Sequence, residues 1–299
     1  MTRADTLPIP QENAAYSARD LLVAYDFSNA ADTCLKYSIM LSKRLGSFVH
    51  LISVQSPSDY ADALEAGPLA MDASHTNRQT ELQALQEKLQ EKGIRSDAVR
   101  RTGNVSDILW EATIELKPDL LLFGAFGHSP TDRRQLGSTA EHLLRTIRCP
   151  ALIVGPHAIL KEDEAPPIRR ILCATTSLES PDEIVSFAGS LAARMEAQIE
   201  LLNSVDPAQE GLSSRYHERR SEEWSRTLRR QGVRAAWTLL YGAPGEVIPA
   251  RANETNASLI LFGLHHRGHR MVDCPDGVVS SAVRHARCPV MTVPLALPL

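Results

Sequence analysis

The chain contains an internal duplication, and this repeat restricts the fold more than any other feature of the sequence. Residues 103–154 align with residues 242–293 at a constant shift of 139 positions and without a gap. The matched segments include Gly103 and Gly242, Asp119–Gly124 and Ser258–Gly263, and Arg148-Cys149-Pro150 and Arg287-Cys288-Pro289. Because the repeat has the size of a domain and far exceeds the unit of a solenoid, it predicts two tandem domains with one fold.

The boundaries of the two copies follow from length and composition. The 299 residues suit two domains of roughly 150 residues each. The opening strands align at a shift of 150, so the second copy is about 11 residues shorter between its second and third strands. We expect a polar, flexible N-terminus over residues 1–17, a first domain over 18–155, a Pro-rich charged linker over 156–167 and a second domain over 168–299.

Apolar runs of strand length alternate with segments of helical periodicity in both copies. In the first copy we expect strands over residues 20–26, 48–54, 96–102, 120–123 and 149–154, and helices over 31–45, 77–92, 104–116 and 139–147. Residues 55–74 have no strong period and contain two prolines, so we expect a long loop or lid there, in which a short helical piece stays open. This alternation predicts an α/β fold in which helices cover both faces of a parallel sheet.

Composition excludes several classes of protein. A net charge of −4 and an isoelectric point of about 6.2 argue against a nucleic-acid-binding surface. No apolar run reaches the roughly 18 residues of a membrane-spanning helix, and the N-terminus lacks the apolar stretch of a secretory signal. The five cysteines are odd in number and lack C-x-x-C spacing, so we expect neither a disulfide framework nor a zinc site. We therefore expect a cytoplasmic protein that binds neither nucleic acid nor membranes.

A glycine-rich loop joins the fourth strand of the first copy to the next helix. Its spacing is G-x2-G-x9-G-S-T, with Gly124, Gly127, Gly137, Ser138 and Thr139 at the fixed positions. At the carboxyl end of a parallel strand, free backbone N–H groups and the positive end of a helix dipole attract phosphates. Glycine permits close approach of the backbone to a ligand, and the two hydroxyls add donors. The loop matches neither the Walker A motif nor the dinucleotide pattern G-x-G-x-x-G.

This spacing and its setting resemble the universal stress protein family, in its nucleotide-binding branch. The resemblance covers nearly the whole chain as two consecutive copies and includes the opening strand, Leu22–Ser28, with its acidic end at Asp26. It implies two tandem three-layer α/β/α domains of the adenine-nucleotide α-hydrolase-like type. Each would contain a five-stranded parallel sheet with the strand order 3-2-1-4-5.

The resemblance also implies a binding site for ATP and Mg²⁺ in the first copy. Asp26 would contact the ribose or the adenine, Ala24 would line the base pocket, and the backbone of Val54 would pair with the adenine edge. The ribose and phosphates would be held by Gly124, Gly127, Gly137, Ser138 and Thr139. The magnesium ion would bind through the phosphates, since it prefers oxygen ligands and water.

The second copy departs from this motif. At the shift of 139, the positions of Gly127, Gly137, Ser138 and Thr139 carry His266, Asp276, Gly277 and Val278, and Asp26 is replaced by Thr176. Only Gly263, which matches Gly124, keeps its register. A carboxylate at position 276 would repel phosphate. We therefore expect the second site to be degenerate for ATP.

Simpler interpretations of several residues stay open. The first loop could be a glycine turn without a ligand, and Asp26 could cap the helix that follows it. Cys149 and Cys288 are expected to be small buried hydrophobic residues and not nucleophiles. His142 is expected to lie on a helix surface or in packing contacts.

A group of histidines in the second copy could suggest a metal site. It consists of His265, His266, His269 and Cys274. The spacing fits no structural zinc pattern, and we expect these residues in an exposed loop. We therefore expect no protein-bound metal there.

The leading hypothesis is a regulatory stress-response protein that binds one ATP in its first domain. The second domain would be a pseudo-symmetric structural partner, paired with the first through the strands at 149–154 and 288–293, and association into a homodimer stays open. No catalytic arrangement such as Ser/His/Asp can be assembled, so we expect at most slow ATP hydrolysis. The alternatives are an interaction module without nucleotide control and an adenylating enzyme, although Asp26–Asn29 stands where such enzymes usually carry a Ser-Gly-Gly loop.

Overall fold

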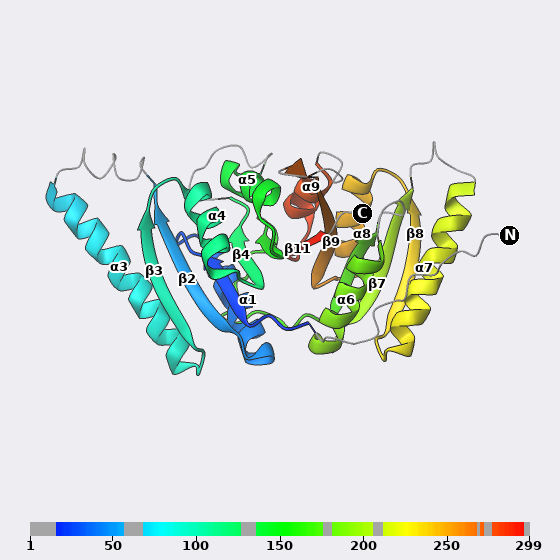
Figure 1. The fold of residues 1–299 in the computed structure, drawn as a ribbon, viewed down its shortest axis with the longest axis horizontal. Coiled ribbons are helices and arrows are strands. Elements are labelled where there is room, and N and C mark those ends of the chain that lie inside the picture. Colours follow the sequence, from blue (N-terminus) through cyan, green and yellow to red (C-terminus); the bar gives the residue numbers. More distant parts are fainter. Residues whose placement is uncertain are drawn as a thin grey trace.

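The computed structural model describes residues 16–56, 68–126, 136–175, 181–205, 212–267, 270–271 and 277–295. These residues form two α/β units that lie side by side, the first in the left half of Figure 1 and the second in the right half. Strands alternate with helices in each unit, as the sequence predicts.

The first unit runs from β1 to β5. Its elements are β1 (Asp20–Ala24), α1 (Asn29–Leu45), β2 (Phe48–Gln55), α3 (Pro68–Glu91), β3 (Ser96–Thr102), α4 (Val105–Leu116), β4 (Leu120–Gly124), α5 (Ser138–Thr146) and β5 (Ala151–Val154). Most helix ends have local causes. Ser28 caps α1 by accepting from the Ala31 N–H, and Gly46 ends α1 in the left-handed conformation with φ 76°.

The second unit repeats this order from β6 to β11. Its elements are β6 (Arg170–Thr175), α6 (Pro181–Met195), β7 (Gln198–Val205), α7 (Leu212–Arg230), β8 (Ala235–Tyr241), α8 (Pro244–Glu254), β9 (Leu259–Arg267), β10 (Arg270–Met271), α9 (Val278–His285) and β11 (Val290–Leu295). The strand β10 forms an antiparallel hairpin with β9 and has no counterpart among the described elements of the first unit.

The strand order confirms the expected topology in both units. It is β3-β2-β1-β4-β5 in the first unit, and β8-β7-β6-β9-β11 in the second. The register is conserved between the copies, because Leu21 pairs with Leu120 and the equivalent Ile171 pairs with Leu259. The duplication of the sequence is therefore a duplication of the fold at the level of residue pairs.

One strand pairing joins the two sheets. β5 and β11 are antiparallel, with Ile153 opposite Val290 and Leu152 opposite Met291. All four residues of β5 are buried. The result is a continuous sheet whose outer edges are β3 and β8.

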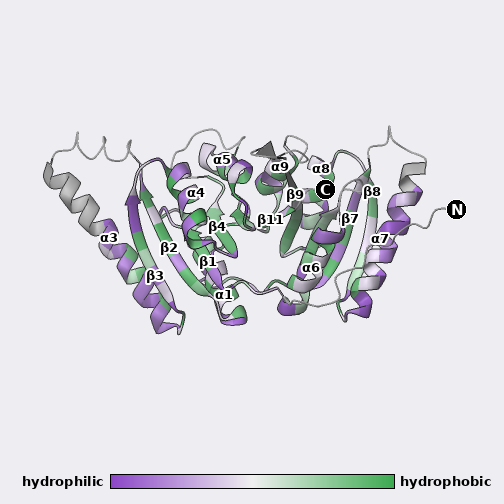
Figure 2. Cartoon of the chain, viewed as in Figure 1, coloured by the Kyte–Doolittle hydropathy of each residue, from purple (hydrophilic) through white to green (hydrophobic). Residues whose placement is uncertain are grey.

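The core lies on both faces of this sheet. Neighbouring residues of a strand point to opposite faces, so Leu21 and Leu22 belong to different hydrophobic clusters. One cluster packs beneath α1, α3, α6 and α7, and the other beneath α4, α5, α8 and α9, and both continue through the two units. Figure 2 shows the hydrophobic residues concentrated in the central strands and hydrophilic residues along α7. No helix in the described part of the chain combines the length and the apolar character needed to cross a membrane.

Two secondary-structure predictions were wrong. The helix expected from Asn77 begins at Pro68, because proline is tolerated in the first turn of a helix and does not have to end one. The strand β9 continues to Arg267, so the backbone of His265 and His266 forms part of a strand where we expected a loop. The loop residues 57–67 lie outside the described residues, as do His269 and Cys274.

The first described residue, Tyr16, contacts the second unit. The Tyr16 ring makes an edge contact with Phe187 of α6, with ring centroids 4.9 Å apart. The backbone N–H of Tyr16 donates to the Ser190 hydroxyl on the same helix. Tyr16 therefore makes tertiary contacts although it falls within the N-terminus that we expected to be flexible.

Candidate functional site

The expected nucleotide-site residues come from the carboxyl ends of three neighbouring strands. β1 lies between β2 and β4, with Ala24 opposite Ile52 and Val23 opposite Leu122. Ala24, Val54 and Gly124 lie at or beside the ends of these strands. The order of the sheet reverses between β1 and β4, which is where open α/β sheets bind ligands. Asp26 follows β1, Gly137 to Thr139 open α5, and Gly127 lies outside the described residues.

Asp26 does not cap α1, so that alternative was wrong. Its Oδ1 accepts a 3.0 Å hydrogen bond from the Ser28 N–H, and Ser28 in turn is the residue that caps the helix. Within the described part of the chain, no hydrogen bond to Oδ2 is found. The half-buried carboxylate is thus oriented by its own turn and keeps acceptor capacity.

Phe27 holds the turn in an uncommon conformation. Its φ is 65°, which costs a bulky residue about 1–2 kcal/mol. Two contacts offset this cost: the Tyr25 ring makes an edge contact at 5.0 Å, and the Arg78 guanidinium of α3 lies 5.4 Å from the Phe27 ring centroid. The sequence did not point to Phe27 or Arg78, because the two residues are about 50 positions apart and their contact forms only in the folded chain.

Tyr25 ties the same turn to α1. Its hydroxyl donates to Asp32 in the first turn of the helix. Burial, and then this contact with Asp32, raise the pKa of Tyr25 well above its ordinary value. Tyr25 therefore stays protonated and acts as a fixed donor beside the expected site.

The glycines of the first motif have packing reasons that are visible in the fold. A Cβ at Gly124 would lie 2.8 Å from the Ala30 Cβ, so this glycine lets α1 approach the strand end. This space is occupied by the helix, whereas we expected it to be open for a ligand. A Cβ at Gly137 would lie 3.1 Å from the Ala125 carbonyl oxygen, which accepts the Gly137 N–H.

The amino end of α5 is suited to an anion. Gly137 is its N-cap, and no side chain caps the helix. The first-turn N–H groups are therefore available together with the hydroxyls of the exposed Ser138 and the half-buried Thr139. The strand β10 of the second unit lies against α5, so the second unit approaches this part of the first.

The equivalent place in the second unit is filled with apolar side chains. A Cβ at Gly263 would lie 2.4 Å from the Leu295 Cδ1 and 3.2 Å from the Ile184 Cβ. The helix α9 begins with Val278 and Val279, which are buried at 9% and 3% exposure and carry no hydroxyl. Val278 takes the place of Thr139 and Gly277 that of Ser138, so α9 begins without the two hydroxyls that are present at the start of α5.

The remaining candidates are structural. Burial raises the pKa of the Cys149 thiol to about 11 and that of the Cys288 thiol to about 12, so neither is a nucleophile near neutral pH. His142 is exposed on α5. No group of three or more His, Cys, Asp or Glu residues that could hold a metal ion is found among the described residues.

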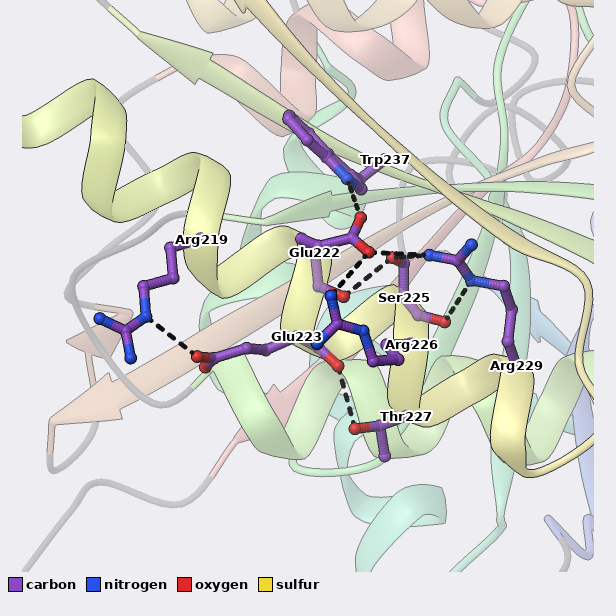
Figure 3. A network of polar contacts seen from close by, with 8 residues as sticks. All are labelled: Arg219, Glu222, Glu223, Ser225, Arg226, Thr227, Arg229 and Trp237. Atoms are coloured by element: carbon purple, nitrogen blue, oxygen red, sulfur yellow. Dashed lines mark hydrogen bonds and ion pairs between the residues drawn. The ribbon is translucent and has the colours of Figure 1, made fainter.

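A network of polar contacts lies on α7 of the second unit, away from the expected site (Figure 3). The Glu222 carboxylate accepts the Trp237 indole N–H at 2.7 Å and meets Arg226 and Arg229 at 3.3 Å. The Trp237 hydrogen bond, followed by Arg226, lowers the pKa of Glu222. The Trp237 contact attaches α7 to β8, whereas the two arginine contacts lie within α7.

Comparisons with known proteins agree with this fold and this repeat. The model of the universal stress protein family matches residues 18–155 and 167–294. A universal stress protein of Methanocaldococcus jannaschii is 23% identical over 138 residues, which are 46% of this chain and 81% of that protein.

Two solved structures share the fold over most of the chain. A universal stress protein from Archaeoglobus fulgidus superposes with a TM-score of 0.72 at 18% identity, over 93% of this chain and 99% of that one. A protein from Pseudomonas aeruginosa described as functionally unknown superposes with a TM-score of 0.62 at 18% identity, over 95% of each chain. Since the family model matches most of the sequence in two consecutive regions, the chain belongs to the universal stress protein family.

Proposed function

We propose that this chain is a regulatory stress-response protein with one site for ATP and Mg²⁺, located in its first domain. The asymmetry between the copies carries this proposal. No side chain caps α5 or its counterpart α9, but α5 begins with two hydroxyl residues, Ser138 and Thr139, and lies at the switch point of the sheet together with the oriented Asp26 carboxylate. The second unit has buried valines and the Leu295 side chain at the equivalent positions.

The site residues have distinct roles in this proposal. Asp26 accepts from the ribose or adenine, Ala24 lines the base pocket and the Val54 backbone pairs with the adenine edge. The phosphates would take N–H and hydroxyl donors from the start of α5, at Ser138 and Thr139, while the ribose and phosphates would lie along the Gly-rich segment with Gly124, Gly127 and Gly137. Mg²⁺ would bind through the phosphate oxygens and water, where it neutralises negative charge.

The second domain contributes the structural half of the molecule. We assign residues 18–155 and 168–299 to the two domains and residues 156–167 to the linker. The β5–β11 pairing supports association of the domains through these strands in solution, because it buries both strand edges. Homodimers would then form through another surface.

Calorimetric titration of the full chain with ATP and Mg²⁺ tests the site. We expect one nucleotide per chain, and Asp26→Asn should weaken binding about tenfold because it removes a charge-assisted hydrogen bond while Oδ1 can still accept from Ser28. Ser280→Ala on α9 is the matched control and should bind as the parent does. Two nucleotides per chain would contradict the asymmetry, and absence of binding would contradict the ATP site.

A protein-interaction role without nucleotide control is the second candidate. It is favoured by an apolar patch on α4, where Trp110 and Ile114 are 42% and 53% exposed and lie one turn apart. This role predicts that ATP leaves the melting temperature unchanged in the parent and in a Gly127→Val variant. A rise in the parent alone would support the nucleotide site instead.

A further inference from the structure

A cavity of about 310 Å³ lies at the junction of the two units. It is bordered by α1 of the first unit, by the segment that links the units, and by the end of α6 in the second unit. Apart from the linker and the middle of α1, the lining residues lie at or just after the carboxyl ends of α1, α3 and α6 or precede the amino end of β6. The cavity is therefore at the opposite edge of the sheet from the proposed ATP site.

The linker is attached to α1 and closes one side of this cavity. The Leu160 N–H donates to the Thr33 hydroxyl at 3.1 Å, and the Leu160 carbonyl accepts from the Lys36 ammonium at 3.4 Å. Further along, Lys43 pairs with Glu164 at 3.7 Å. A ligand in the cavity would therefore touch both domains and the linker at once.

The cavity combines an apolar wall with an excess of positive charge. Its apolar members are Ile39, Met40, Ala165, Pro167, Ile168 and Met195. Its charged members are five cations and three carboxylates, which leaves an excess of two positive charges. Such a surface favours a molecule with an apolar body and a negative head group.

Two of the cations are already explained by the fold. Lys43 and Arg44 lie in the last turn of α1, where they complement the negative end of the helix dipole. Arg44 also pairs with Glu196 across the unit boundary at 2.5 Å. This contact, with Arg169 nearby, lowers the pKa of Glu196, so the carboxylate is ionised between two guanidinium groups.

The other cations have less compensation. The half-buried Lys36 ammonium meets a carbonyl and no carboxylate within the described part of the chain. Among the same residues, Lys92 has no side-chain partner, and Arg169 acts electrostatically on Glu196 without a direct ion pair. These three side chains line the same cavity as the apolar wall and supply its positive charge. From this arrangement we infer that the cavity is a second ligand site, specific for a small organic anion with an apolar body, such as a medium-chain carboxylate.

Titration of the full chain with octanoate tests this site, with octanol and acetate as the separated halves of the ligand. We expect octanoate to saturate one site per chain and both halves to bind at least about tenfold more weakly, because each lacks one of the two recognised features. Non-saturable binding, or octanol binding as tightly as octanoate, would contradict the inference.

Variants locate the site. Lys92→Glu with Arg169→Glu should weaken octanoate binding at least about tenfold, whereas Arg234→Glu, an exposed charge reversal next to β8, should leave it unchanged. Ala165→Leu fills the cavity and should weaken binding without changing any charge. Circular dichroism melts confirm that each variant folds. Unchanged affinity in both cavity variants would overturn the assignment, and ATP titration of the same proteins keeps this result separate from the nucleotide site.

Discussion

At the scale of single residues, equivalent positions of the two copies have the same structural role but carry side chains of different chemistry. The Asp119 carboxylate accepts the backbone N–H groups of Arg19 and Asp20 at the amino end of β1. In the second unit, the hydroxyl of Ser258 accepts the two equivalent N–H groups of β6, at 2.9 and 2.8 Å. The same backbone donors are satisfied by a carboxylate and by a hydroxyl, so a position can be structural in both copies while its charge differs.

The cysteines give a residue-scale prediction. Burial raises the pKa of Cys149 to about 11 and those of Cys173 and Cys288 to about 12. Because only the thiolate reacts, iodoacetamide at neutral pH should label these thiols far more slowly in the folded protein than in denaturant. Mass spectrometry of timed samples measures this. Rapid labelling of Cys149 in the folded protein would show that its thiol is activated.

Gly124 gives a second prediction at this scale. Its substitution by alanine places a methyl group 2.8 Å from the Ala30 Cβ, so α1 must shift. We expect Gly124→Ala to lower the free energy of unfolding by about 1–3 kcal/mol, as overpacking does. Gly245→Ala is the control, since its Cβ would meet only ordinary contacts at 3.5 Å or more. Urea denaturation of both variants compares them, and equal stability would mean that the close approach of α1 is not needed.

At the scale of elements, α7 differs from its counterpart α3 in how it attaches to the sheet. At the shift of 139, the buried Leu82 of α3 corresponds to Ser221 of α7, which accepts a 2.6 Å hydrogen bond from the buried Asn203 amide. Glu222 adds the Trp237 contact to β8. The second unit thus replaces part of an apolar helix–sheet contact with polar pairs that fix geometry.

His217 on α7 makes this element sensitive to pH. Burial lowers the pKa of His217 from its ordinary value of 6.5. The imidazole of His217 therefore binds a proton more readily in the unfolded chain than in the folded protein. As a result, the free energy of unfolding should fall as the pH drops below about 6.5. His217→Gln should reduce the loss of unfolding free energy between about pH 7.5 and about pH 5.5. Denaturation curves at both values measure it, and parallel losses in parent and variant would exclude this origin.

At the scale of the whole molecule, the joint between the units rests on a close backbone approach. A Cβ at Gly155, just after β5, would lie 1.8 Å from the Val283 carbonyl oxygen of α9. No side-chain movement can relieve a clash with backbone. Glycine at this position therefore permits the second unit to dock against the first along β5 and β11.

Gly155→Ala should consequently loosen the joint while each unit stays folded. We expect the radius of gyration from small-angle scattering to increase and thermal unfolding to separate into two transitions. Gly93→Ala is the control: its φ of 76° makes alanine cost about 1 kcal/mol, but nothing lies within 4 Å of the added Cβ. A single unchanged transition in Gly155→Ala would show that the joint tolerates displacement.

The sequence by itself determined the fold class, the duplication and the loss of the motif in the second copy. Apolar periodicity and turn residues indicate the local conformation of the first copy. Because the repeat has no gap, the same conformation is predicted for the equivalent residues of the second copy. Strand positions follow from this: the strand expected over 120–123 predicts a strand from Leu259, where β9 begins.

Only the tertiary structure decided which distant residues meet. Several contacts join segments that have no local sequence pattern in common. They are Arg78 over Phe27, Tyr16 on Phe187, Gly155 against Val283 and the cavity between α1 and α6. The start of α3 at Pro68 was missed for a related reason, since a proline signals either a break or a first helical turn, and local sequence does not choose between them. Such contacts depend on the packing of the whole chain, because the free energy of a long-range contact is set by both partners and by what excludes water around them.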